Sequence, residues 1–101
     1  MNSILDRIYE YKKIEVKDSY NSLPINDLIK YASEQAGAER SFSGAIRNNT
    51  ITGKISLICE IKKASPSKGI LKDVFNVSEI AKEYSSAGAT CISVLTDTPS
   101  F

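Results

Sequence analysis

The run from Cys59 to Gly69 reads C-E-I-K-K-A-S-P-S-K-G and is the most informative part of this 101-residue chain for its chemistry. Glu60 and Lys62 stand two positions apart at the end of an apolar run. In a strand they would share one face, with their Cα atoms about 6.6–7 Å apart. A carboxylate and an ammonium so placed keep each other charged. The lysine can then bind a carboxylate or phosphate or donate a proton, and the glutamate can orient it or act as a base.

A polar turn follows this pair. Residues Ser65–Gly69 supply hydroxyls, a rigid proline and backbone amides in a loop that comes directly after the predicted strand. In parallel α/β folds the loops at that end of the strands bind ligands. A second interpretation stays open on the residues alone. Glu60 and Lys62 would then lie on the solvated face of an edge strand, and Ser65–Ser67 would be only a turn.

Other side chains with chemical potential have plainer interpretations. Lys63 and Lys68 are interpreted as surface charges. Thr96–Asp97 follows a second apolar run and either caps the next segment or lines a site, and capping is favoured. Cys59 and Cys91 each lie within an apolar run, which favours two buried, reduced thiols over a disulfide.

Composition excludes several classes of function. The chain has no histidine, which excludes Ser-His-Asp and Cys-His catalysis and removes the commonest zinc ligand. It has 13 basic and 12 acidic side chains, for a net charge of +1, so a basic nucleic-acid-binding face is not expected. Neither a G-x-G-x-x-G pattern nor a P-loop occurs, so a nucleotide cofactor has no support. We therefore expect no metal, no cofactor and no nucleic-acid partner.

Targeting signals are not expected either. Three charged residues interrupt the N-terminus before an apolar segment can form: Asp6, Arg7 and Glu10. This pattern predicts no secretory signal. The longest uninterrupted apolar stretch, Leu57–Cys59, is far shorter than the ~18 residues that suggest a membrane span. We therefore expect a cytoplasmic protein that does not bind a membrane.

The first half of the chain predicts three helices. The first begins at Ser3, which forms a capping-box pattern with Asp6. The second begins at Pro24, ends at Gly37 and buries an apolar stripe. That stripe consists of Ile25, Leu28, Ile29 and Ala32. The third spans Phe42–Arg47, is capped by Ser41 and leads into a polar stretch at 48–50.

The second half predicts a strand–helix–strand unit. A β-branched run at 55–61 and another at 90–95 are the strands, and a loop at 64–76 and a helix at 78–87 ending at Gly88 lie between them. Such strands pair in parallel with a right-handed crossover. Two parallel strands leave open edges and uncovered faces, which indicates the opening section of a larger α/β protein. We expect a helical extension over 1–53 and a first βαβ unit over 54–101.

The sequence also resembles the indole-3-glycerol-phosphate synthase family. The run Ile58–Gly69 closely resembles the family's signature, and the string E-I-K-K-A-S-P-S within it is highly specific. Four further parts resemble the family's opening helix, its pre-barrel segment, the end of its first barrel helix and its second strand. They are Ile4–Ile8 with Tyr11-Lys12, Ser41–Ile46, Ala87–Ala89, and Ile92–Asp97.

The resemblance implies a fold, a reaction and a partner. The fold is the N-terminal part of a (β/α)₈ TIM barrel with a helical extension, of which about two barrel strands are present. The reaction belongs to tryptophan biosynthesis. A carboxy-lyase converts 1-(2-carboxyphenylamino)-1-deoxyribulose 5-phosphate to indole-3-glycerol phosphate and releases CO₂ and water, without a metal or an organic cofactor. The partner is this small phosphorylated substrate, and a further partner is the remainder of the barrel.

The resemblance also implies roles for individual residues. Glu60 arranges the catalytic lysines, and Lys62 meets the substrate carboxylate and assists the acid chemistry. Ser65 contacts the phosphate and Pro66 shapes the pocket. Phe101 stands where the family has an aromatic residue that packs on the anthranilate ring. The principal general-acid lysine comes from the family's third strand, which lies outside these 101 residues, so we expect the chain alone to have no appreciable activity.

Two other functions remain open at this point. One is a different phosphate-binding barrel enzyme such as phosphoribosylanthranilate isomerase, although the signature run argues against it. The other is a non-catalytic protein, which is either a remnant or a half-barrel that associates with a separately encoded remainder. Open strand edges are suited to such pairing.

Overall fold

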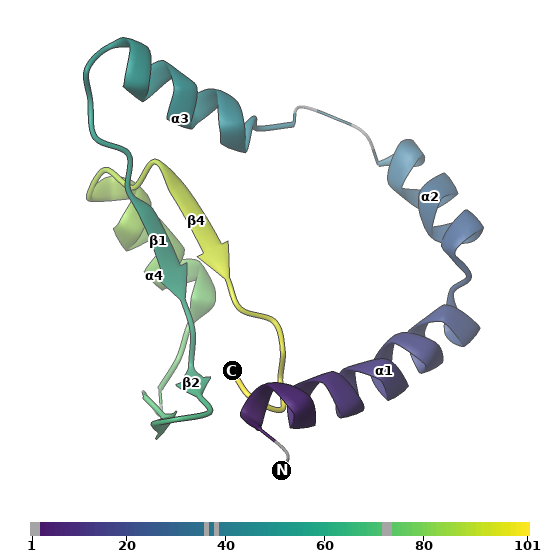
Figure 1. Cartoon of the computed structure of the whole chain (residues 1–101). Coiled ribbons are helices and arrows are strands. Elements are labelled where there is room, and N and C mark those ends of the chain that lie inside the picture. Colours follow the sequence, from purple (N-terminus) through teal and green to yellow (C-terminus); the bar gives the residue numbers. More distant parts are fainter. Residues whose placement is uncertain (1–2, 36, 38, 72–73) are drawn as a thin grey trace. The chain divides into compact units, whose positions relative to one another are not determined.

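The computed structural model describes residues 3–35, 37, 39–71 and 74–101 (Figure 1). The elements in chain order are α1 (Ile4–Ser22), α2 (Ile25–Glu34), α3 (Phe42–Ile51), β1 (Ile58–Ile61), β2 (Ala64–Ser65), β3 (Gly69–Ile70), α4 (Val77–Ser86) and β4 (Cys91–Val94). They form two compact units, residues 1–39 and 40–101. The first unit holds α1 and α2, and the second holds all the other elements. The helix α3 thus shares a unit with the strands, and the division of the chain at 53/54 stays a prediction.

The helix α1 begins as the sequence predicts. Ser3 is its N-cap and forms a capping box with Asp6. The Asp6 carboxylate accepts hydrogen bonds from the Ser3 main-chain nitrogen and from the Ser3 hydroxyl, both at 2.9 Å. The Ser3 hydroxyl in turn accepts from the Asp6 main-chain nitrogen at 3.1 Å. These contacts satisfy donors that the first turn of a helix would otherwise leave unpaired.

The prediction for α2 was wrong in its limits and in its burial. Pro24 precedes the helix as its N-cap instead of lying in the first turn, and the helix ends at Glu34, before Gly37. Ile25, Leu28 and Ile29 are 47%, 46% and 59% exposed, because an apolar face is buried only where another element packs closely on it.

The helix α3 is longer than predicted, since it continues through 48–50 to Ile51. Polar residues do not end this helix, because their hydroxyls bond to main-chain carbonyls of the helix. The Thr50 hydroxyl donates to the Ile46 carbonyl at 3.1 Å. The Thr52 hydroxyl donates to the Asn48 carbonyl at 2.9 Å. At the start of the helix the predicted cap is present, with the Ser41 hydroxyl accepting from the Gly44 nitrogen at 3.0 Å.

The predicted order of strand, helix and strand is confirmed, but both strands are shorter than the predicted 55–61 and 90–95. β1 and β4 pair in parallel, with a register that runs from Ile58 opposite Cys91 to Ile61 opposite Val94. The connecting helix α4 packs on β1 and is capped by Asn76, one position earlier than expected for a helix starting at 78. After the helix, Gly88 adopts a φ of 100°, which allows the chain to turn tightly into β4.

The predicted loop at 64–76 contains a small antiparallel hairpin. β2 and β3 pair through Ala64 opposite Ile70 and Ser65 opposite Gly69. Gly69 has a φ of 65°, a conformation that few other residues adopt, and this returns the chain after the Ser-Pro-Ser-Lys turn. The hairpin was missed because its strands have two residues each, too few for an alternating apolar pattern.

A polar cluster ties α3 to the amino ends of both long strands. The Asn49 side-chain amide donates to the hydroxyls of Ser56 and Thr90, each at 3.2 Å. The Thr90 hydroxyl also accepts from the Leu57 nitrogen at 3.0 Å. At the same end, the Cys91 thiol lies 3.7 Å from the Phe42 carbonyl. These contacts leave the carboxyl ends of the strands, where the predicted site lies, free of α3.

The core of the second unit is small. In the described part of the chain, Ile61 at 2% exposure and Cys91 at 7% are the buried hydrophobic residues. Ile58 and Val94 in the same two strands are 55% and 45% exposed, in line with the expectation that two strands cannot cover their own faces. Cys59 is half-buried rather than buried, and both thiols are free. None of the described helices is long and apolar enough to cross a membrane.

Candidate functional site

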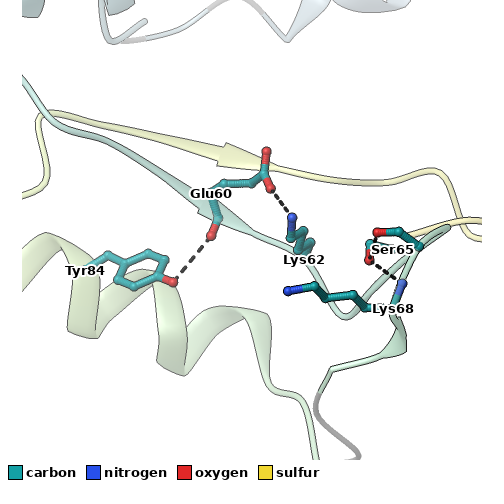
Figure 2. A network of polar contacts seen from close by, with 6 residues as sticks. Glu60, Lys62, Ser65, Lys68 and Tyr84 are labelled. Atoms are coloured by element: carbon teal, nitrogen blue, oxygen red, sulfur yellow. Dashed lines mark hydrogen bonds and ion pairs between the residues drawn. The ribbon is translucent and has the colours of Figure 1, made fainter.

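The site centres on Glu60 and Lys62, at the carboxyl end of β1 (Figure 2). The Lys62 Nζ lies 3.2 Å from the Glu60 Oε1, so the two side chains form the ion pair that their spacing indicates. The Lys62 side chain is 39% exposed and that of Glu60 is 48% exposed. Glu60 stands opposite Ser93 of β4 in the register. The pair is therefore open to solvent, and a ligand can reach both charges.

The backbone of Glu60 makes a second contact, to the helix that packs on this strand. The Tyr84 hydroxyl of α4 donates to the Glu60 carbonyl at 3.3 Å (Figure 2). From the sequence, Tyr84 was not expected to contact the site. A tyrosine on the apolar face of a helix usually carries its hydroxyl to a polar partner, and that signal could have found this contact.

The turn after β1 is organised by Ser65. Its hydroxyl accepts a hydrogen bond from the Lys68 main-chain nitrogen at 3.2 Å and lies 3.5 Å from the Ser67 hydroxyl (Figure 2). Ser65 is half-buried and Pro66, the next residue in the turn, is exposed. The Ser65 hydroxyl thus accepts one hydrogen bond from the main chain, and a hydroxyl can also donate one.

A cleft of about 470 Å³ lies between this turn and the segment that follows β4. The Ala64 nitrogen donates to the Phe101 carbonyl at 3.1 Å, which brings the two segments together. The polar and aromatic lining consists of Lys63, Ser65, Thr96, Thr98, Ser100 and Phe101. Thr96 lines the cleft, although the sequence favoured a capping role for it. An ammonium, several hydroxyls and an aromatic wall can bind an oxyanion attached to a flat apolar group.

The structure groups the predicted site residues into two neighbouring places. Ser65 and Phe101 line the cleft just described. Glu60 and Lys62 line another cleft of about 380 Å³, together with Tyr84 and Ile80 of α4. Lys63 joins the two, because it follows Lys62 in the chain and lines the first cleft. Pro66 lies in the turn and lines neither cleft.

A metal site is not formed by the residues that the structure describes. No group of three or more cysteine, aspartate or glutamate side chains stands close enough together to hold an ion there. The charged side chains near the carboxyl ends of β1 and β4 include Glu60, Lys62 and Lys63, and Asp97 follows β4. These groups can move protons and bind anions.

The chain is similar to proteins of one family along almost its whole length. The family model for indole-3-glycerol phosphate synthase matches residues 5–101. The chain is 43% identical, over all of its 101 residues, to the indole-3-glycerol phosphate synthase of Azoarcus sp. (strain BH72), and it covers 38% of that relative. It is 48% identical over 97 residues, or 96% of the chain, to the indole-3-glycerol phosphate synthase of Legionella pneumophila (strain Paris), covering 35% of it.

The chain thus spans less than two-fifths of the length of these curated relatives. The part that it matches is their N-terminal part, and its helices followed by parallel strands fit the beginning of the family's TIM barrel. The family match covers nearly the whole chain and includes the strands, the turn and the cleft described above. The chain belongs to the indole-3-glycerol phosphate synthase family.

Proposed function

We propose that this chain supplies the first part of the active site of an indole-3-glycerol phosphate synthase. The reaction closes the ring of 1-(2-carboxyphenylamino)-1-deoxyribulose 5-phosphate with loss of CO₂ and water. The observation that carries the proposal is the 3.2 Å ion pair between Glu60 and Lys62 at the carboxyl end of a parallel strand. Active sites of (β/α)₈ barrels lie at that end of the strands.

The chemistry of the reaction suits these two side chains. Ring closure needs an acid at the sugar carbonyl, and the dehydration needs an acid and a base. In the proposal, the Lys62 ammonium binds the substrate carboxylate and assists protonation. The Glu60 carboxylate, 3.2 Å from the Lys62 ammonium, orients it.

The neighbouring cleft suits the two ends of the substrate. Ser65 binds the phosphate through its hydroxyl, and Pro66 shapes the turn that presents it. Phe101 packs on the anthranilate ring. Two aromatic rings attract each other in an offset or edge-to-face arrangement. The support for these roles is that Ser65 and Phe101 line the same cleft of about 470 Å³.

The remaining active-site groups are proposed to come from the part of the barrel that the 101 residues do not contain. A (β/α)₈ active site is assembled from the ends of several strands, and β1 and β4 supply only two of them. The 101-residue polypeptide by itself is therefore proposed to have no appreciable synthase activity. We propose that its partner is the polypeptide that carries the later strands of the barrel. We also propose that the enzyme is cytoplasmic.

A chimera tests the function directly. In it, the aligned 97 residues of this chain replace the corresponding segment of the Legionella pneumophila relative. We expect the chimera to turn over the substrate at a rate within about tenfold of that of the parent enzyme. A chimera that is folded but inactive, beside an active parent, would contradict the proposal and favour a non-catalytic remnant. Appreciable turnover by the 101-residue polypeptide alone would contradict its dependence on the later strands.

A further inference from the structure

A tight turn follows β4. The Asp97 carbonyl accepts two main-chain hydrogen bonds, from the Ser100 nitrogen at 3.2 Å and from the Phe101 nitrogen at 2.8 Å. Pro99 lies inside this turn, and its ring fixes one of the backbone angles between the bonded ends. Aspartate, proline and serine are common in turns for such conformational reasons. The shape of the turn is therefore set by contacts within the turn itself.

The main chain of Phe101 is held on both sides. Its nitrogen is bonded to Asp97, and its carbonyl accepts from the Ala64 nitrogen at 3.1 Å. With both peptide groups fixed, the side chain can move only about its own torsion angles. Phe101 is half-buried and lines the cleft of about 470 Å³. The direction in which its ring enters the cleft is therefore set mainly by the turn.

These contacts are compatible with a closed barrel. They lie in the loops after β1 and β4 and use no hydrogen-bonding group of either strand. Later strands can therefore pair with the outer edges of β1 and β4 without displacing the turn. We expect the same turn in the complete enzyme.

We propose that Asp97 is a positioning residue, whose main-chain carbonyl holds the turn and so sets the Phe101 ring in the cleft before the substrate binds. The proposal rests on the role proposed above for Phe101, which is to pack on the anthranilate ring. Asp97 itself does not touch the substrate. An aromatic wall that is already in place binds a flat ring without the cost of ordering a loop. Because this packing is the same before and during the reaction, its loss weakens binding more than the chemical step.

The test exchanges one main-chain group in the chimera. Incorporation of phenyllactic acid at position 101 replaces the N–H of Phe101 by an ester oxygen. The change removes the 2.8 Å hydrogen bond to Asp97 and keeps the aromatic ring. We expect KM to rise by about 3- to 10-fold, the usual worth of one hydrogen bond, with kcat changed less than twofold. An unchanged KM would overturn the positioning role while leaving the function of the chimera intact.

The matched control is the same ester at Phe75. The main-chain nitrogen of Phe75 donates no hydrogen bond to the residues that the structure describes. We expect this ester to change neither constant. Equal rises in KM for the two esters would show that the Asp97 turn has no specific effect, and would refute the proposal.

A second background separates positioning of the ring from general support of the loop. In Phe101→Leu the ring contact is already lost, so the corresponding ester, made with leucic acid at position 101, should raise KM further by less than twofold. Equal fold-rises with and without the aromatic ring would mean that the turn acts independently of the ring. That result would also refute the positioning role.

The crystal structure of the phenyllactic acid chimera is a readout that does not depend on activity. We expect the ring at position 101 to leave the cleft or to occupy more than one rotamer. A ring unchanged in the cleft would overturn the positioning role, whether or not the chimera is active. A displaced ring in an inactive chimera would support the positioning role and contradict only the proposed function.

Discussion

The main-chain nitrogen of Ala64 donates a hydrogen bond to the carbonyl of Phe101 at 3.1 Å. This contact joins the turn after the first long strand to the segment after the second, beyond the point where the strands themselves pair. The cleft lined by Ser65 and Phe101 exists because these two segments meet. The geometry of the cleft therefore depends on both loops at the carboxyl ends of the strands.

Replacing Lys62 by alanine should abolish most of the activity of the chimera. The change removes the ammonium 3.2 Å from Glu60 and with it the proposed acid assistance. We expect kcat/KM to fall by about 10²- to 10⁴-fold, the usual worth of a positioned acid or base. Steady-state kinetics measures this, and Lys82→Ala, an exposed lysine of α4, is the control. Normal turnover by a folded Lys62→Ala protein would remove Lys62 from the mechanism.

Replacing Ser65 should weaken substrate binding more than catalysis. Its hydroxyl is the proposed phosphate ligand, so Ser65→Ala should raise KM by about 10-fold, which corresponds to roughly 1.4 kcal/mol. Ser65→Thr keeps the hydroxyl and should restore most of the affinity. Ser86→Ala, at the end of α4, is a control away from the turn. If the alanine and threonine variants bind equally well, the hydroxyl is not a phosphate ligand.

Acidification should weaken the start of α1. Hydrogen bonds from the main chain and side chain of Ser3 hold the pKa of Asp6 below its ordinary value of 3.8. Because the folded pKa is lowered, the stabilisation is present above the ordinary pKa and is lost as the pH falls through the folded value. Amide NMR signals of the first turn should therefore shift between about pH 5 and pH 2. Asp6→Asn should remove this dependence, and its persistence in that variant would assign the transition to another group.

The polar cluster around Asn49 should contribute to the stability of the second unit. Asn49→Ala would leave the hydroxyls of Ser56 and Thr90 without this donor, at a cost of about 1–3 kcal/mol in the free energy of unfolding. Asn48→Ala is the matched control, since that neighbour is exposed on the same helix. Urea unfolding of the chimera measures both. Equal midpoints for the two variants would show that the cluster contributes nothing.

The hairpin after β1 should depend on the conformation of Gly69. Nothing lies within 4 Å of the position that a Cβ would occupy there, so a side chain meets no steric clash. Its φ of 65° nevertheless makes Gly69→Ala unfavourable by about 1–2 kcal/mol, and Gly69→Asn should cost less. Comparing the urea midpoints of the two variants in the chimera tests this. An alanine variant as stable as the wild type would mean that the turn has relaxed to another conformation.

Features encoded within a few residues could be predicted from the sequence. The spacing of Glu60 and Lys62 predicted their ion pair. The Ser3–Asp6 pattern predicted the capping box, and Gly88 predicted the turn before β4. Each depends only on local geometry, namely the period of a strand, the first turn of a helix or one φ angle.

Contacts between distant segments could not be predicted in this way. The Tyr84 contact to Glu60, the Ala64 contact to Phe101 and the Asn49 cluster each require the packing of elements that are far apart in the chain. For the apolar stripe of α2, the sequence predicted contacts that the structure does not show. The periodicity of the stripe predicted burial, but burial also requires close packing against another element, and these side chains stay exposed.

The parallel pairing of β1 with β4 also sets an order of events during synthesis. Leu57 and Thr90, which join at the start of the sheet, are 33 positions apart. At about 5–20 residues per second, a ribosome needs roughly 2–7 s to make that interval. Helices such as α1 form from local contacts in about a microsecond or less. The nascent β1 is therefore without β4 for seconds, and during this time Ile58 and the preceding Leu57, each 55% exposed even in the folded chain, are available to a chaperone or to another nascent chain.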